Sequence, residues 1–421
     1  MSEPANSIVA RGFTPRRLPR LVWRALSTAC PSIGLRYLDH LIRISVDQER
    51  RSPRSSAAPV ALFGGFDVNI GIARAAQFLR AGLEAASVSV HPMDCSAVLR
   101  PLPGPPSRPP APASGTMVFC VNPPQMTPLL RHFGPRICRG KRLIGYWWWE
   151  LDRLPHAWLK WAALMDEIWV SSRFVEQTCR RALPGKVIRY IPLPVPEPLP
   201  SAADRAAFGL PAERFTVLVA FDLSSHWARK NPEGAIAAFR RAFPDPAAAH
   251  LVLKVAGGDQ RPDQLERLRA LTAELPNLTI IDRELPAGDL AALMRCCDVL
   301  LSLHRSEGLG LFIAEAMWLG LPVIATGWSG VMDMLTPENA LLVKFRMVPV
   351  RPADYPSVPR GAKWAEPDVD HAAECLRRLA EDADLKGRLR ARARQRAEEQ
   401  FSLERFCAIA PALLTPSVEK R

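Results

Sequence analysis

The sequence predicts an α/β protein built from two doubly wound parallel sheets. Short apolar runs alternate with segments of helical periodicity in both halves of the 421-residue chain. Such uninterrupted apolar strands are typical of parallel sheets that helices cover on both faces. A proline-rich segment near the middle separates the two halves. We therefore expect two domains that face each other across a cleft, with ligands bound at the carboxyl ends of their strands.

The first domain is predicted at residues 59–195, after a basic extension at residues 1–58 that has a helical pattern at 35–46. A helix is expected at 72–84, and prolines exclude a helix or central strand between 99 and 112. The expected strands of this domain are 60–63, 117–121, 142–146 and 167–170.

The second domain is predicted at residues 196–421, and we expect its last helix to pack back on the first domain. Alternating prolines stiffen the expected linker, residues 191–213, as polyproline II. The expected strands are 216–221, 251–255, 278–281, 298–303 and 322–326. The expected helices between them are 232–243, 262–275, 287–297 and 311–319.

Composition and charge narrow the class of protein. Apolar residues make up 48% and charged residues 23%, which is ordinary for a globular protein with more than one core. No apolar run is long enough for a transmembrane helix, and the first apolar patch is broken by Arg24 and lacks a cleavage site. The nine cysteines show no metal or redox spacing. We expect a protein of the reducing cytoplasm.

The net charge of +13 suggests partners that carry phosphate. Arginines gather in the extension at residues 1–58 and in a run at 388–396. Three interpretations stay open: a solvated basic face, which we favour, peripheral contact with an anionic membrane surface, and nucleic-acid binding, which we favour least.

The loop before the helix predicted at 311–319 carries the most informative motif. Gly308 and Gly310 let the backbone approach a ligand closely, and the free amides of a first helical turn bind phosphate. Glu307 stands on this loop, and Glu315 lies roughly 7–8 Å along the helix axis beyond Gly310. A diphosphate bound between them would have a carboxylate on each side, one suited to a ribose and the other to a sugar.

This segment resembles the signature of the family-4 (group 1) retaining glycosyltransferases of the GT-B fold. That signature is two glutamates separated by seven residues, within Glu-Gly-Phe-Gly-Leu and before Gly-x-Pro-Val; here Leu309 replaces the usual phenylalanine. The resemblance implies two Rossmann-like domains and sugar transfer from a UDP- or GDP-sugar to a carbohydrate or lipid-linked acceptor, in glycan or polysaccharide biosynthesis. It implies no metal and no cofactor. Glu307 would position the donor sugar, and the implied donor-binding residues are Gly308, Leu309, Gly310, Leu311 and Glu315.

A basic pair continues the resemblance after the first strand of the second domain. In the family such a pair grips the donor diphosphate, because adjacent cations stabilise a leaving anion without a metal. Lys230 matches the family's lysine, whereas the family's earlier arginine falls at Ser224 and is missing, so Arg229 is the expected substitute. Ser329 and Gly330 stand where the family has two glycines and are expected to border the donor pocket.

The first domain resembles the acceptor half of the family more weakly. Gly71 ends a glycine-rich loop whose spacing does not fit the dinucleotide fingerprint, and Asn122 and Glu150 follow two strands. Trp149 closes a run of three tryptophans. Because strand neighbours alternate sides, at least one indole is expected to line the cleft and stack on a sugar; an aromatic packing cluster is the open alternative. These four residues are the acceptor-side candidates.

Other functions remain open at this stage. They are another GT-B enzyme, such as a sugar synthase, phosphorylase or nucleotide-sugar epimerase, and a membrane- or nucleic-acid-binding protein driven by the basic extension. A dinucleotide oxidoreductase is least favoured, since no Gly-x-Gly-x-x-Gly follows a predicted strand. Two acidic pairs, Asp368 with Asp370 and Asp382 with Asp384, resemble metal-binding pairs, but their polar helical surroundings predict surface residues. We predict no metal site.

Overall fold

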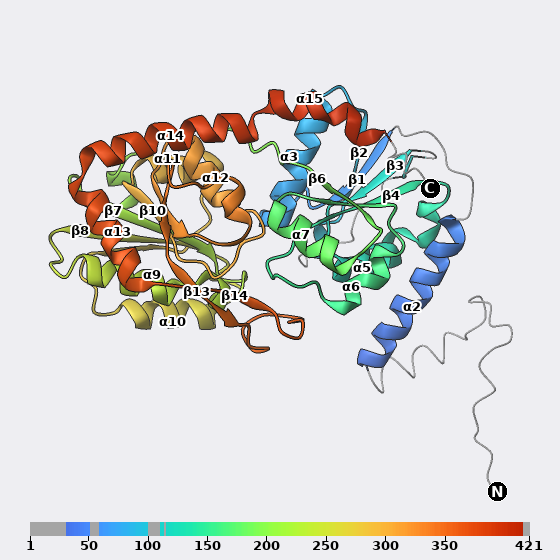
Figure 1. The fold of residues 1–421 in the computed structure, drawn as a ribbon, viewed down its shortest axis with the longest axis horizontal. Coiled ribbons are helices and arrows are strands. Elements are labelled where there is room, and N and C mark those ends of the chain that lie inside the picture. The colour runs from blue at the N-terminus through green and yellow to red at the C-terminus, as the bar shows by residue number, and fades with distance from the viewer. Residues whose placement is uncertain (1–30, 51–58, 100–109, 113–114, 416–421) are drawn as a thin grey trace, which may run out of the picture.

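The computed structural model describes residues 31–50, 59–99, 110–112 and 115–415. Two lobes lie side by side, each formed by a parallel sheet with helices packed around it (Figure 1). The predicted pair of doubly wound domains is therefore confirmed. Most of the basic extension and most of the proline-rich loop before residue 112 lie outside the described residues.

The first lobe has a six-stranded parallel sheet in the order β2–β1–β3–β4–β5–β6. Its strands are β1 (Val60–Gly64), β2 (Val90–Asp94), β3 (Thr116–Phe119), β4 (Arg142–Trp147), β5 (Glu167–Val170) and β6 (Val187–Tyr190). Its helices are α2 (Pro31–Arg50), α3 (Gly71–Ala85), α4 (Ser96–Leu99), α5 (Pro123–Phe133), η2 (Pro135–Cys138), α6 (His156–Ala162) and α7 (Arg173–Ala182). The four predicted strands are confirmed to within two residues. The edge strands β2 and β6 were not predicted, because their half-buried residues include proline and arginine and give no continuous apolar run.

The second lobe has a six-stranded parallel sheet in the order β12–β11–β10–β7–β8–β9. Its strands are β7 (Phe215–Asp222), β8 (Ala249–Ala256), β9 (Leu278–Ile281), β10 (Val299–Ser302), β11 (Val323–Thr326) and β12 (Leu341–Val343), and all five predicted strands are confirmed. Its helices are η3 (Ala206–Phe208), α8 (Trp227–Lys230), α9 (Pro232–Ala242), α10 (Pro262–Thr272), α11 (Ala287–Arg295), α12 (Leu311–Trp318), η4 (Ser329–Asp333), α13 (Val369–Glu381) and α14 (Ala383–Phe401). An antiparallel hairpin, β13 (Phe345–Pro349) and β14 (Lys363–Pro367), was not predicted.

The connection between the lobes is part of the core. Residues 191–200 carry no regular secondary structure, yet Leu193 and Val195 are buried in a cluster that contains apolar residues of both lobes. The indole nitrogen of Trp318 donates to the carbonyl of Val195 at 2.8 Å, which ties α12 to this linker. This linker therefore joins the lobes through apolar packing and a hydrogen bond as well as through the peptide chain.

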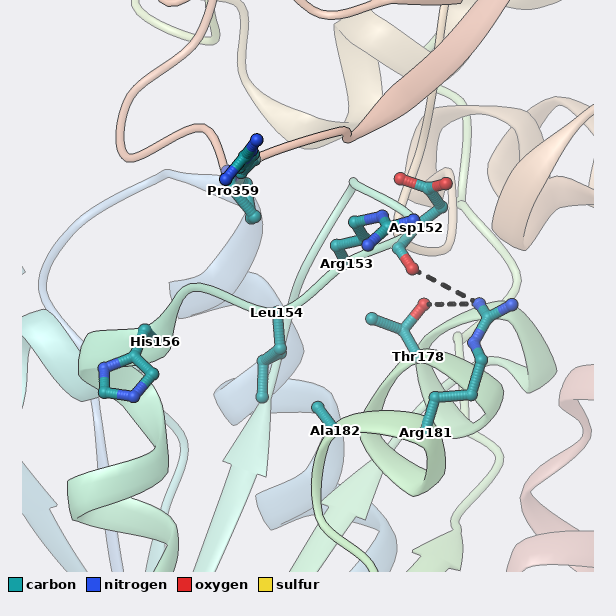
Figure 2. Close-up of a pocket in the computed structure, with 9 residues that line it drawn as sticks. Asp152, Arg153, Leu154, His156, Thr178, Arg181, Ala182 and Pro359 are labelled. Atoms are coloured by element: carbon teal, nitrogen blue, oxygen red, sulfur yellow. Dashed lines mark hydrogen bonds between the residues drawn. The ribbon is translucent and has the colours of Figure 1, made fainter.

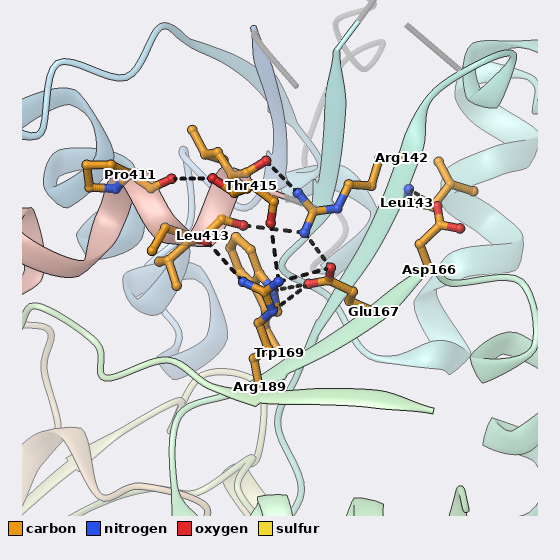
Figure 3. A network of polar contacts seen from close by, with 11 residues as sticks. Arg142, Leu143, Asp166, Glu167, Trp169, Arg189, Pro411, Leu413 and Thr415 are labelled. Carbon is orange, nitrogen blue, oxygen red and sulfur yellow. Dashed lines mark hydrogen bonds and ion pairs between the residues drawn. The ribbon is translucent and has the colours of Figure 1, made fainter. Parts of the chain in front are cut away.

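The C-terminal helices also join the lobes. Helix α14 runs along the second lobe and α15 (Leu403–Leu414) continues onto the first, where it packs against α3 (Figure 1). Arg142 and Arg189 donate to the end of α15, at the carbonyls of Leu414 (2.8 Å) and Ala412 (3.1 Å), and both contact the buried carboxylate of Glu167 (Figure 3). Cations satisfy the free carbonyls at a helix C-terminus.

Two of the acidic residues that resemble metal ligands cap helices. The Asp368 side chain accepts from the backbone amides of Asp370 and His371 at the start of α13, and Asp382 accepts from the amide of Leu385 at the start of α14. Both are N-caps, which stabilise the first helical turn. Within the described part of the chain, no helix has the length and apolar character needed to cross a bilayer.

Candidate active site

The loop from β10 to α12 is held in one shape by the loop that follows β11. The amide of Glu307 donates to Ser329 Oγ at 2.8 Å, and the amide of Gly330 donates to the carbonyl of Glu307 at 2.9 Å. A Cβ on Gly330 would overlap the carbonyl oxygen of Gly308, so only glycine lets the two loops meet. Gly310, with φ at 91°, then starts α12 in the left-handed region that glycine favours.

The carboxylate of Glu307 is clamped by two cations from α8. Lys230 Nζ lies 2.6 Å from one oxygen and Arg229 Nη1 lies 3.1 Å from the other. Burial by itself would raise the pKa of Glu307, but Lys230 and Arg229 hold it well below its ordinary value. The site therefore carries a fixed anion with a cation beside it at neutral pH.

The two cations differ in access. The side chain of Lys230 is 21% exposed, whereas that of Arg229 is 6% exposed. Arg229 also donates to the carbonyl of Ser306 at 3.1 Å, and its Nε has no hydrogen-bond partner among the described residues. Burial alone would lower the pKa of Arg229, and the nearby Glu307 raises it above its usual range. Lys230 is thus the accessible cation, and Arg229 lies beneath the loop.

A buried histidine sits beside this pair. His304 Nδ1 lies 2.9 Å from Ser302 Oγ, and burial lowers the pKa of His304 to about 4. It is neutral at physiological pH, so it adds no third positive charge beside Lys230.

Glu315 meets a residue of the other lobe. Arg74, in the first turn of α3, donates from both terminal nitrogens to the two oxygens of Glu315 in α12, a bidentate pair that spans the lobes. The sequence analysis did not select Arg74. The available signal was a cation in the first turn of a helix that follows a glycine-rich loop, the place where a bound phosphate would lie.

The hairpin β13–β14, which the sequence did not predict, contacts the β10–α12 loop. Arg305, on the β10–α12 loop, pairs with both oxygens of Glu366 in β14 at 2.8 Å. Beyond β13, the hydroxyl of Tyr355 donates to Glu150 of the first lobe at 2.5 Å. Burial raises the pKa of Tyr355 well above its usual value, and Glu150 raises it further, so the phenol keeps its proton. The hairpin links the loop of Glu307 to the first lobe.

The acceptor-side candidates lie along the first lobe but differ in role. Gly71 is exposed at the start of α3, and Asn122 Oδ1 accepts from the backbone amide of Trp148 at 2.9 Å. The indole of Trp149 is buried against Trp158, with ring centroids 4.8 Å apart, so it packs in the core instead of offering a face to a sugar. The packing-cluster alternative holds for this ring.

The lobes also approach each other closely at the β10–α12 loop. A Cβ on Gly308 would lie 3.1 Å from the carbonyl oxygen of Trp149, so the two main chains nearly touch there. Leu309 is buried and Leu311 is half-buried. The structure thus brings the second-lobe candidates together beyond the carboxyl ends of β7, β10 and β11, and Gly308 of this group lies against the first-lobe loop that carries Glu150.

Comparisons with known proteins agree with this arrangement. Residues 202–399 match the family model described as glycosyl transferases group 1. The fold is similar to that of sucrose-phosphate synthase from Thermosynechococcus elongatus, with a TM-score of 0.61 and 19% identity over 86% of this chain and 98% of that one. It is also similar to HepE from Anabaena, solved with UDP and glucose, with a TM-score of 0.57 and 16% identity over 84% of this chain and 98% of that one.

A third structure is a pneumococcal O-GlcNAc transferase, GtfA, in complex with UDP and GlcNAc, with a TM-score of 0.50 and 14% identity over 71% of this chain. This chain spans 56% of the length of that protein. At these identities the likeness shows the fold. Among curated proteins, no sequence match was found.

Proposed function

We propose that this chain is a retaining glycosyltransferase that uses a nucleotide diphosphate sugar, since residues 202–399 match the model of glycosyl transferases group 1 and the fold is that of GT-B proteins. The observation that carries the proposal is the carboxylate of Glu307 clamped by Lys230, on a glycine-rich loop that leads into α12. An accessible cation, a fixed anion and helix amides converge there. These are the groups needed to hold a diphosphate and a sugar.

Lys230 neutralises the departing diphosphate in this proposal, together with the free amides at the start of α12. Its 2.6 Å ion pair with Glu307 holds the ammonium at the loop. Arg229 acts through Glu307, because its guanidinium is buried beneath the loop and bound to the Ser306 carbonyl. We therefore assign Arg229 to positioning, although the sequence analysis assigned it to the diphosphate.

Glu315 binds the ribose of the nucleotide in this proposal. Its carboxylate lies within α12, whereas Glu307 precedes that helix, and it accepts hydrogen bonds from Arg74 of the first lobe. A ribose diol offers two hydroxyl donors to a carboxylate. The donor must therefore compete with Arg74 for Glu315, and nucleotide binding loosens the pair that links the lobes. We assign the remaining contacts with the donor nucleotide sugar to Gly308, Leu309, Gly310, Leu311, Ser329 and Gly330.

Retention of the anomeric configuration is a further part of the proposal, and it rests on the family resemblance. We propose front-face attack assisted by the leaving phosphate, with Glu307 positioning the donor sugar. The charges of Lys230 and the helix amides take the place of a metal. The proton NMR spectrum of the first product formed would give its anomeric configuration, and an inverted product contradicts this part. Activity that disappears with EDTA and returns with a divalent cation contradicts metal independence.

We propose that the acceptor is a carbohydrate or lipid-linked sugar that approaches from the first lobe, past Gly71, Asn122 and Glu150. Glu150 lies on the loop beside Gly308 and is fixed by Tyr355. We place the reaction in the cytoplasm, in glycan or polysaccharide synthesis. The exposed arginines of α14 support peripheral contact with an anionic membrane surface.

The test is binding and slow hydrolysis of a panel of UDP-, GDP-, ADP- and dTDP-sugars. Wild type is compared with Glu315→Ala and Lys230→Ala, and the control is Glu213→Ala, an exposed carboxylate just before the amino end of β7, at the opposite end of that strand from the site. We expect one nucleotide to bind tightly, to lose at least about tenfold in affinity in the two site variants, and to be unaffected in the control. A folded wild type that binds none of them contradicts the proposal.

A further inference from the structure

A pocket of about 500 Å³ lies on the outer side of the loop that follows β4. Its walls come from this loop, from α6 and α7, and from the turn of the β13–β14 hairpin, so it joins the first lobe to an element of the second (Figure 2). None of the residues given a role above lines it. Its chemistry is set by Arg153, Arg181, Arg360, His156 and Asp152.

The pocket has an excess of positive charge. Three arginines line it against a single carboxylate, and Asp152 already accepts from the amide of Lys363 at 2.9 Å. Within the described residues, the side chains of Arg153 and Arg360 make no hydrogen bond or ion pair. Arg181 makes only long contacts, at 3.3 Å to the Asp152 carbonyl and 3.4 Å to Thr178 Oγ1.

Contacts of its main chain and of its guanidinium fix the position of Arg153. Trp149 Nε1 donates to the carbonyl of Arg153 at 2.7 Å, and a Cβ on Gly361 would lie 3.6 Å from the guanidinium carbon of Arg153. The guanidinium therefore lies within van der Waals distance of the hairpin turn at residue 361. Arg153 and Arg360 thus come from different lobes and share one pocket.

We propose that this pocket binds a phosphate group carried by the acceptor. Guanidinium groups bind phosphate oxygens through paired, charge-assisted hydrogen bonds. Two arginines without a partner among the described residues and a third with only long contacts around one pocket favour a multiply charged oxyanion. The assignment to the acceptor rests on the proposed function. The position of the pocket supports this assignment. The carbonyl of Trp149 adjoins Gly308 on the loop that we assign to the donor. Arg153 stands four residues after Trp149, so at most about 14 Å of chain separates Arg153 from Trp149.

A phosphate in this pocket would also affect the position of the β13–β14 hairpin. A phosphate held by both Arg153 and Arg360 would draw the hairpin turn onto the first lobe, and the same hairpin fixes Glu150 through Tyr355. An acceptor with the phosphate would then complete the acceptor side of the cleft, and one without it would leave the hairpin turn held by fewer contacts.

The experiment measures dissociation constants for inorganic pyrophosphate, decyl phosphate and glucose 6-phosphate by calorimetry. All proteins carry Lys230→Ala, which weakens anion binding at the donor side. The test variant adds Arg153→Gln and Arg360→Gln, and the matched control adds Arg240→Gln and Arg295→Gln, two exposed arginines of α9 and α11. We expect pyrophosphate to bind the parent and the control alike, and at least about tenfold more weakly to the test variant.

Tighter binding of decyl phosphate than of glucose 6-phosphate supports a lipid phosphate, and the reverse order supports a sugar phosphate. Equal pyrophosphate binding by test variant and control, or no binding by the parent, overturns the proposal. These readouts do not use the donor, so they stand even if no nucleotide sugar binds. If the transferase proposal holds, the Arg153→Gln, Arg360→Gln variant with Lys230 intact will show a raised KM for a phosphorylated acceptor and an unchanged KM for the donor.

Discussion

Two buried glutamates in this molecule are each held by two cations, and they sit in different surroundings. Glu307 pairs with Arg229 and Lys230 at the cleft, and Glu167 pairs with Arg142 and Arg189 under α15. The exposed fractions of the side chains are 12% for Glu307 and 4% for Glu167. Lys230 and Arg189 are equally exposed, at 21%.

The difference lies in what else the cations bind. Around Glu167, Arg142 and Arg189 donate to backbone carbonyls at the end of α15, so their hydrogen-bonding capacity serves the fold (Figure 3). Among the contacts described for Lys230, the ammonium donates only to Glu307, although it has three hydrogens to offer. A buried charge pair therefore indicates a binding site when one partner keeps accessible donors, and an anchor when its donors are all used.

The largest expected effect is on catalysis. Glu307→Gln keeps the shape of the side chain but removes the fixed anion that positions Lys230 and the donor sugar. We expect kcat for sugar transfer to fall roughly 100- to 1000-fold, the range for loss of one preorganised electrostatic group. The measurement is steady-state transfer, or donor hydrolysis, by protein shown to be folded by circular dichroism. Wild-type turnover in this variant would place the chemistry elsewhere.

The matched change at the other glutamate should affect stability instead. Glu167→Gln leaves Arg142 and Arg189 without their carboxylate, and loss of one partner of a buried pair costs about 3–5 kcal/mol. We expect the free energy of unfolding to fall by about that amount, with kcat per folded molecule within about twofold of wild type. Urea denaturation checks the first value. If Glu167→Gln instead lost most of its kcat and kept its full stability, Glu167 would not differ in role from Glu307.

The buried histidine gives the donor side a pH dependence. The pKa of His304 is about 4 in the folded protein and near 6.5 when unfolded, so below pH 6.5 the unfolded chain binds a proton that the native chain does not. The free energy of unfolding should therefore fall as pH drops from 6.5 to 4.5, by about 2–3 kcal/mol. His304→Gln should flatten this slope in urea titrations at several pH values. An unchanged slope would mean that His304 is already charged in the native state.

The smallest expected effect concerns the pair between the lobes. Arg74→Ala frees Glu315 from a partner that the nucleotide must displace, and a partly exposed ion pair contributes about 0.5–1 kcal/mol. We expect the nucleotide to bind about two- to fivefold more tightly, with Arg80→Ala, further along α3, as the control. Isothermal titration calorimetry gives the dissociation constant of the nucleotide for each variant. Weaker binding in Arg74→Ala would make Arg74 a ligand of the donor phosphates and not a competitor.

The site residues and loops of the second lobe were easier to predict from the sequence than those of the first lobe. Strand β10, Gly308, Gly310 and α12 are neighbours in the chain, so local patterns were enough to predict the loop and both glutamates. Lys230 was selected from the family resemblance, because it matches the family's lysine shortly before α9, and its role stays a prediction. Composition and periodicity also predicted both parallel sheets, since their central strands are continuous apolar runs.

Contacts between distant segments could not be predicted in this way. Arg74 and Glu315 are 241 residues apart, and Tyr355 and Glu150 are 205 apart, so no local pattern joins them. The run of tryptophans predicted an aromatic in the cleft, but packing against Trp158 decided the place of Trp149. The role of Arg229 depended on its burial, which its exposed-looking neighbours in the sequence did not reveal.

The central claim is that Lys230 is the accessible cation of a nucleotide site, and its most direct test uses the matched pair of cations. Lys230→Ala and Arg189→Ala each remove an equally exposed cation from a buried glutamate. The measurement is the dissociation constant of the nucleotide diphosphate that wild type binds best. We predict a rise of at least about tenfold for Lys230→Ala and no change for Arg189→Ala. Equal dissociation constants in the two variants would contradict the claim.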